Sequence, residues 1–134
     1  MSHTREEKIE AFGRFIDILD ILREKCPWDH KQTNESLRPN TIEETYELCD
    51  ALIRKDNEAT KKELGDVLLH IAFYAKIGEE NGSFDIADVC NALCEKLIYR
   101  HPHVFGTTHV DGSNEVEQNW EVCSRGSRTA SFGY

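Results

Sequence analysis

The sequence has few basic residues, few prolines and no long apolar run. It holds 16 Lys and Arg among 134 residues against 25 Asp and Glu, a formal net charge of -9. Proteins that contact nucleic-acid phosphates directly need a basic surface, so this balance argues against a nucleic-acid partner. No apolar run approaches the roughly 20 residues that span a bilayer, so we expect no membrane partner. The length and the 39% of hydrophobic residues are typical of one globular domain.

Signals for disulfides and for export are also lacking. The five cysteines are odd in number and lack the close spacing of a disulfide framework, which indicates free thiols in a reducing compartment. The polar start over residues 1–8 leads into no apolar signal segment, so we expect a cytoplasmic location. We expect the domain to cover residues 1–123, with a disordered tail of small and polar residues over 124–134.

Apolar residues recur at helical spacing through most of the chain, and no segment alternates as a strand does. Pro27 and Pro102 end two of these patterns, and Asn81-Gly82 ends another. Thr41 followed by Glu44 has the form of a capping box, which places a helix start at Thr41. The expected helices cover about 5–24, 41–55, 57–80, 85–100 and 113–123. The pattern predicts an all-α bundle of four to five antiparallel helices that dimerises through helix faces.

Two pairs of acids lie on helix sides that also carry apolar residues. At about 100° per residue, Glu44 and Glu47 lie roughly 60° apart. Leu48 and Ala51 share their sector, and the other side of this helix carries Ile42, Tyr46, Cys49 and Ile53. In the next helix, Glu63 and Asp66 begin a sector that continues with His70, Phe73 and Ile77, beside a main apolar face of Leu64, Val67, Leu68, Ile71 and Ala75.

Acids in such sectors lose water when the helices pack, and an unpaired buried carboxylate is costly. Two acid pairs on adjacent antiparallel helices would supply most of the oxygen ligands of one Mg²⁺ or Mn²⁺, or of a pair of ions. His70 follows Asp66 by one turn and is placed to orient a carboxylate.

Each pair also has a simpler explanation. Acids near a helix start favour the helix dipole, and Glu44 closes the expected capping box. Glu63 and Asp66 would be exposed, or would form salt bridges to Lys61, Lys62 or Lys76. Asp66 and Gly65 nevertheless weaken the middle of a helix, glycine by about 1 kcal/mol relative to alanine, which favours a role other than stability.

Two acidic motifs follow each other along the chain, Glu43-Glu44-Thr45-Tyr46-Glu47 and then Glu63-Leu64-Gly65-Asp66. They resemble the EExxE and ExxD signatures of the MazG family of nucleoside triphosphate pyrophosphohydrolases. The flanking blocks Cys26-Pro27-Trp28-Asp29, Gln32-Thr33, Ser36-Leu37 and Lys96 to Gly106 are similar as well, so the resemblance covers roughly residues 22–121.

The resemblance implies a Mg²⁺-dependent enzyme that cleaves nucleoside triphosphates between the α and β phosphates, and a homodimer or larger homo-oligomer. It implies metal ligation by Glu44, Glu47, Glu63 and Asp66, with Glu43 and Glu44 as the catalytic acids; Glu43 would help to ligate the metal or to position the attacking water. The implied need for Mg²⁺ is consistent with these acidic residues, because an acidic site can bind a polyphosphate only through bridging cations. No P-loop motif is present to bind the phosphates instead.

Three further side chains are candidates for substrate binding. Lys96 and Arg100, one turn apart, would bind phosphates, and Trp28 would stack on a base or ribose. The alternatives are a solvated basic helix end for the first two and a cover over the core for Trp28. His101 and His103 fit a turn better than a zinc site, and Cys90 and Cys94 fit core thiols.

The end of the chain departs from the family pattern. Ser124 stands where family members usually carry a lysine, and the second, similar half of many members is missing. The alternative function is therefore a catalytically weak nucleotide-binding or regulatory module that is a helical dimer. A di-iron bundle is disfavoured, because no glutamate has a histidine three residues later.

Overall fold

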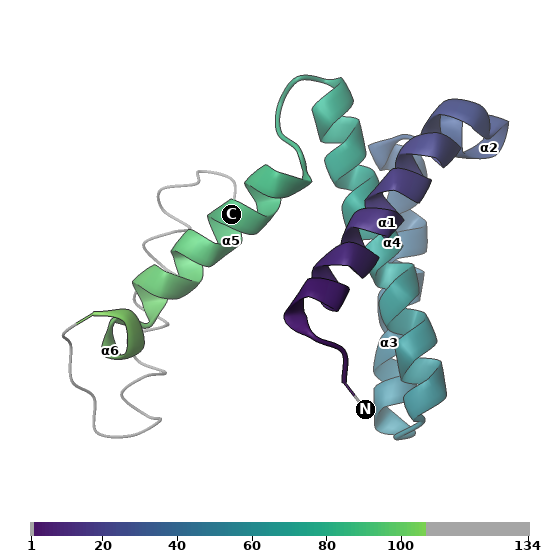
Figure 1. Cartoon of the computed structure of the whole chain (residues 1–134). Coiled ribbons are helices and arrows are strands. Elements are labelled where there is room, and N and C mark those ends of the chain that lie inside the picture. The colour runs from purple at the N-terminus through teal and green to yellow at the C-terminus, as the bar shows by residue number, and fades with distance from the viewer. Residues whose placement is uncertain (1, 107–134) are drawn as a thin grey trace. The chain divides into compact units, whose positions relative to one another are not determined.

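The computed structural model describes residues 2–106, which form two units, residues 2–86 and 87–106. Every regular element in the described residues is a helix, which confirms the all-α class for this part of the chain (Figure 1). The helices are α1 (Arg5–Lys25), α2 (Pro27–His30), α3 (Asn34–Ile53), α4 (Asn57–Glu80), α5 (Ile86–Arg100) and α6 (Pro102–Phe105). None of them combines the length and the apolar character needed to cross a membrane.

Helices α1 and α4 lie where the periodicity of the sequence places them. Thr4 and Glu7 close a capping box at the start of α1. The Asp56 side chain accepts a hydrogen bond from the Ala59 amide at the start of α4, at 3.1 Å. At its end, Gly82 adopts a φ of 73°, a conformation that favours glycine and explains why Asn81-Gly82 ends the helix.

The predicted start of the next helix is wrong. Helix α3 begins seven residues earlier than Thr41, because Thr33 and Ser36 form the capping box there and Pro39 lies inside the helix. The proline removes one amide donor, but the reciprocal cap bonds and the burial of Leu37 hold the first turns in place. Thr41 is therefore an interior residue, and the predicted capping box of Thr41 and Glu44 does not exist.

The one-turn helices α2 and α6 were not expected, because proline at the first helical position was interpreted only as a stop. The expected helix over 113–123 and the expected tail over 124–134 lie outside the described residues. The number of helices in the bundle and its dimerisation stay predictions.

The core of the first unit lies between α1, α3 and α4. Helix α3 packs along α4, and α1 packs on α2 and α4. Its buried residues are Leu19, Leu37, Ala72, Phe73 and Ile77, with Phe15 and Tyr74 packed against them. On α4 the sector of Glu63, Phe73 and Ile77 thus faces the core, whereas the predicted main face is largely exposed, with Leu64 at 54% and Ile71 at 47%.

Arg23 ties three helices of this unit together. Its Nη1 donates hydrogen bonds to the backbone carbonyls of Asp29, His30 and Gln32, at 2.8, 2.9 and 2.9 Å. Its Nε and Nη2 donate to the two carboxylate oxygens of Glu80, each at 2.9 Å. The guanidinium also lies over the Phe73 ring, 5.5 Å from its centre. One side chain of α1 therefore holds the α2 segment and the end of α4.

We expect Arg23→Lys to lower the free energy of unfolding by about 1–3 kcal/mol, because an ammonium cannot satisfy all these acceptors. The measurement is urea denaturation followed by circular dichroism. The matched control is Arg54→Lys, whose Nε also lies 2.9 Å from a carboxylate, that of Asp50, but whose side chain is 52% exposed. The control should leave stability unchanged; equal effects of the two variants would contradict the role given to Arg23.

Candidate metal centre

Three carboxylates meet where α3 packs along α4. Glu44 on α3 and Glu63 and Asp66 on α4 each offer an oxygen, and these oxygens all lie within 4.8 Å of one another. The two acids of α4 are three residues apart, so they lie on one side of that helix. The packing of α3 on α4 then brings Glu44 opposite them. This is the meeting of acid pairs across a helix interface that the sequence predicts, for three of the four acids.

Two oxygens of this group are buried and have no hydrogen-bond partner, namely Oε2 of Glu44 and Oε2 of Glu63. The Glu63 side chain is 12% exposed, whereas that of Asp66 is 40% exposed. A buried carboxylate oxygen without a partner carries a desolvation cost that nothing in the surrounding chain offsets. A bound cation would give both oxygens the partner that they lack.

Of the lysines expected to form salt bridges with Glu63 and Asp66, Lys62 does so. Lys62 Nζ lies 3.2 Å from Oε1 of Glu63 and 3.4 Å from Oδ2 of Asp66. Lys61 and Lys76 pair elsewhere, with Glu58 and with Asp20 and Glu79. The Lys62 side chain is 70% exposed, and exposed ion pairs contribute little. Its contacts also leave the two buried oxygens unpaired, so Lys62 offsets the acidic charge only in part.

The group raises the pKa of Glu44 from 4.5 to about 7. Loss of water on burial is the largest cause, followed by repulsion from the carboxylates of Glu47, Asp66 and Glu63, and a hydrogen bond to Glu47 acts in the same direction. Near neutral pH, Glu44 therefore exchanges between a protonated and a charged form. A divalent cation would compete with that proton for the same oxygens.

A neutral polar layer lies one turn from the carboxylates. The Thr41 hydroxyl on α3 contacts the His70 ring, with 2.6 Å between Oγ1 and Nδ1, and it also hydrogen-bonds the Tyr74 hydroxyl. His70 is 8% exposed, and its burial lowers its pKa, while the charge of Asp66 acts in the opposite direction. No sequence pattern predicts the contacts of Thr41 and Tyr74, except that threonine is an unfavourable residue inside a helix.

The donor set fits a hard divalent cation. All three groups are carboxylates, which suit Mg²⁺ or Mn²⁺ and not the thiolate and imidazole preferences of structural zinc. Glu47, the fourth predicted ligand, is exposed and is not a member of the close group, although its charge helps to raise the pKa of Glu44. Glu43 is exposed next to Glu44. The ligand and catalytic roles of these acids stay predictions.

The remaining predicted site residues lie on other elements. Trp28 is 56% exposed on α2. Lys96 and Arg100 lie on α5, where Lys96 is exposed and Arg100 is buried. Cys90 and Cys94 are exposed free thiols, whereas the sequence suggested core thiols. The substrate-binding roles of Trp28, Lys96 and Arg100 stay predictions.

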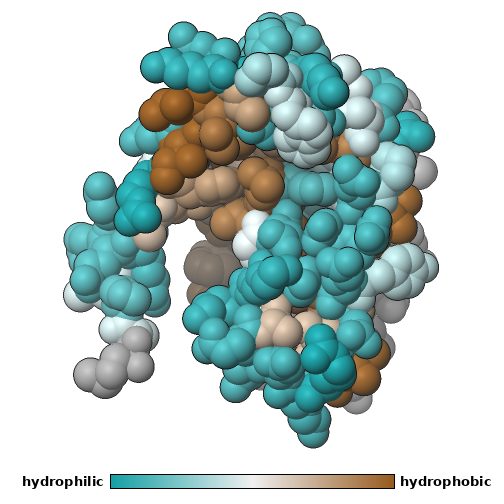
Figure 2. Space-filling view, turned by 90° about the vertical axis from the view of Figure 1, so that its right-hand side faces the viewer, coloured by the Kyte–Doolittle hydropathy of each residue, from teal (hydrophilic) through white to brown (hydrophobic). Residues whose placement is uncertain are grey.

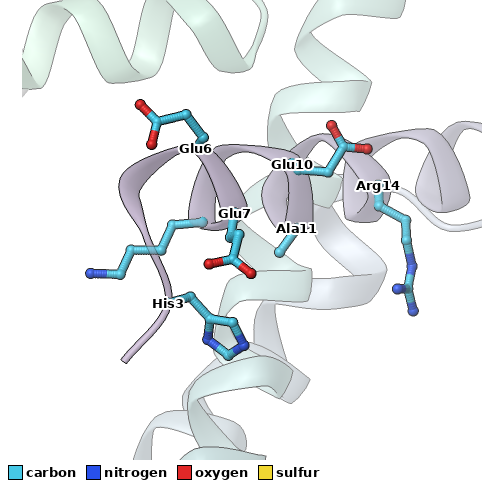
Figure 3. A pocket seen from close by; sticks show the side chains of 7 residues that line it. His3, Glu6, Glu7, Glu10, Ala11 and Arg14 are labelled. Carbon is cyan, nitrogen blue, oxygen red and sulfur yellow. The ribbon is translucent and has the colours of Figure 1, made fainter. Parts of the chain in front are cut away.

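A cavity of 630 Å³ lies at the start of α1 and contains none of the predicted site residues. It is lined by His3, Glu6, Glu7, Lys8, Glu10, Ala11 and Arg14. Figure 3 shows that these side chains spread outward from one helix and do not converge on a common point. The carboxylate group of α3 and α4 is therefore the better candidate site.

Comparison with known proteins gives consistent matches. The model of the MazG nucleotide pyrophosphohydrolase domain matches residues 32–105. A nucleoside triphosphate pyrophosphohydrolase of Escherichia coli K12 is 44% identical over 116 residues, which are 84% of this chain and 44% of the relative. The nucleoside triphosphate pyrophosphohydrolase/pyrophosphatase MazG of Thermotoga maritima is 49% identical over 112 residues, which are 82% of this chain and 42% of the relative. The chain thus spans less than half the length of these two curated relatives.

A solved structure supports the fold. The crystal structure of a mazG-related protein from Thermotoga maritima matches with a TM-score of 0.71, over 84% of this chain and 98% of that one. The two sequences are 24% identical, so this likeness is evidence for the fold alone.

The pKa of Glu44 makes the metal-free protein sensitive to pH. Because the pKa is raised on folding, the folded state binds more protons than the unfolded state between 4.5 and about 7, and stability falls as pH rises through that window. Glutamine resembles the protonated acid, so Glu44→Gln should raise the melting temperature in EDTA at about pH 8 and change it little at about pH 5. The control is Glu24→Gln, an exposed acid on α1, which should show no such difference. An increase in melting temperature of equal size at both pH values for Glu44→Gln would refute the raised pKa of Glu44.

Proposed function

Because the chain belongs to the family of the MazG nucleotide pyrophosphohydrolase domain, we propose that it hydrolyses nucleoside triphosphates between the α and β phosphates. Water is added across that anhydride bond, and the products are a nucleoside monophosphate and pyrophosphate. The cation is Mg²⁺, which Mn²⁺ can replace. The observation that carries the proposal is the group of Glu44, Glu63 and Asp66 with its two buried, unpaired oxygens.

The acids of the group would hold the cation, with Glu47 as a further ligand beside Glu44. A bound divalent cation offsets phosphate charge and acidifies a water molecule. Glu43, exposed next to Glu44 on α3, would orient the attacking water. Lys96 and Arg100 would bind the β and γ phosphates, as a point charge and as a bidentate donor, and Trp28 would stack on the base or ribose.

Electrostatics makes this activity strictly dependent on the cation. Without it, Glu44, Glu63 and Asp66 repel the triphosphate, and the exposed ammonium of Lys62 is a weak counterweight. With it, the local charge becomes attractive to a polyphosphate. Chelation should therefore abolish substrate binding as well as turnover.

The proposal includes a homodimer. Helix α3 exposes an apolar row in which Ile42 is 60%, Tyr46 73% and Ile53 80% exposed. A hollow of 320 Å³ beside it is lined by Thr41, Ile42, Thr45, Tyr46 and Cys49. Figure 2 shows apolar side chains gathered in patches beside a hydrophilic surface. Grouped apolar exposure of this kind is typical of a protein interface, and a second copy of the chain would cover it.

A cytoplasmic location is part of the same proposal. The four cysteines of the described residues, Cys26, Cys49, Cys90 and Cys94, are free thiols. Free exposed thiols persist in a reducing compartment.

The second candidate is a nucleotide-binding or regulatory module with weak turnover. It is favoured by one observation, namely that Ser124 stands where family members usually carry a lysine. The same helices and acids would then bind a nucleotide with Mg²⁺ but release little product.

The test incubates the purified chain with a panel of nucleoside triphosphates and Mg²⁺ and separates the products. We expect pyrophosphate and nucleoside monophosphate, and we expect Glu63→Gln and Asp66→Asn to reduce turnover to background while the helical circular dichroism signal stays. The matched control is Glu58→Gln, an 85% exposed acid on the same helix, which should keep its activity.

Two results would decide against the proposal. Release of single phosphates would show cleavage of a different bond. Calorimetry that detects Mg²⁺-dependent nucleotide binding without any product would favour the second candidate.

A further inference from the structure

The Thr41 hydroxyl is the meeting point of three hydrogen bonds. It donates to the Leu37 carbonyl at 3.1 Å, within α3. Across the helix interface it contacts His70 Nδ1 at 2.6 Å and the Tyr74 hydroxyl, both on α4. These contacts lie in a largely buried place, since His70 is 8% exposed and Tyr74 packs against the apolar core.

The Thr41 hydroxyl can donate only one of these three bonds, because a hydroxyl has one hydrogen to donate and two lone pairs that accept. The Leu37 carbonyl can only accept, so when the hydrogen is directed to it, Thr41 accepts from both residues of α4. His70 must then carry its proton on Nδ1, and its Nε2 is left as an acceptor.

Thr41 and His70 lie where they can set the positions of the carboxylates. Thr41 precedes Glu44 by three residues on α3, and His70 follows Asp66 by four residues on α4. Each is therefore one helical turn from a carboxylate on the same side of its helix. A link between Thr41 and His70 holds the register of the two helices one turn from the oxygens that must converge on one cation.

We propose that Thr41 is a positioning residue for the candidate cation site: its hydroxyl holds His70 as the Nδ1–H tautomer and fixes the register of α3 on α4 that sets Glu44 against Glu63 and Asp66. The inference rests on the proposed cation site. Groups that orient metal ligands without touching the metal change metal affinity by about 10–100-fold when they are removed. Thr41 acts in this way through the helix register and through His70.

The first measurement uses the unmodified chain. Long-range ¹H–¹⁵N NMR spectra of the neutral imidazoles separate the two tautomers, and His70→Gln identifies the signal of His70. We expect the Nδ1–H form for His70. An Nε2–H form would overturn the proposal, because Thr41 would then be the donor.

The second measurement compares variants by Mn²⁺ binding, followed by the electron paramagnetic resonance of free Mn²⁺. Thr41→Val keeps the shape and removes the hydroxyl, and we expect it to weaken binding about tenfold or more and to mix the tautomers of His70. Thr41→Ser restores the hydroxyl and should restore both readouts. The matched control is Thr45→Val, an exposed threonine whose hydroxyl donates to the Thr41 carbonyl within α3, at 2.8 Å; it should change neither.

The outcomes separate this inference from the proposed function. If the unmodified chain does not bind Mn²⁺, the cation site itself fails, and the positioning role fails with it. If the unmodified chain binds Mn²⁺ and Thr41→Val binds equally well, only the positioning role is overturned. Loss of binding in Thr41→Ser as well as in Thr41→Val would assign the effect to packing and would also overturn it. If Thr41→Val does not fold, Mn²⁺ binding by Thr41→Ser and the His70 tautomer of the unmodified chain still test the positioning role of Thr41.

Discussion

Repulsion between carboxylates at the α3–α4 interface is the constraint around which this part of the molecule is arranged. Glu44, Glu63 and Asp66 approach within 4.8 Å, and two of their oxygens are buried without a partner. Loss of water on burial, and then repulsion from the neighbouring carboxylates, raises the pKa of Glu44 to about 7. An interface selected only for stability would not keep such a group, because a proton or Lys62 relieves it incompletely. A bound divalent cation would offset most of this repulsion, and it would make the site more attractive to a triphosphate.

The rest of the first unit holds these acids in place. Three layers follow one another along the α3–α4 interface: the carboxylates, then Thr41 with His70, then the apolar core around Leu37 and Phe73. The core makes the helices rigid, and the middle layer satisfies buried polar groups between the core and the charges. Arg23 attaches the α2 segment, which carries Trp28, to the same core. The site therefore depends on packing that lies outside it.

Local patterns predicted what depends on local sequence. The long periodic segments gave α1 and α4 nearly to the residue, and the i, i+3 spacing placed Glu63 and Asp66 on one side of α4. The form of a capping box at Thr41 and Glu44 predicts the wrong start for α3, because Thr33 and Ser36 form the cap and the helix tolerates Pro39 inside it. The more apolar face of α4 predicts the wrong core side, since the helix buries the sector of Glu63 and Phe73 and leaves Leu64 exposed. The contact of Thr41 with His70 depends on the register between two helices, which no single segment encodes.

The convergence of Glu44, Glu63 and Asp66 on a cation can be measured by anomalous diffraction from a crystal of the chain grown with Mn²⁺, because the signal locates the metal independently of activity. We expect an anomalous peak among the carboxylate oxygens of these three residues. Peaks only at other surface acids, with Oε2 of Glu44 and of Glu63 still unpaired, would contradict it.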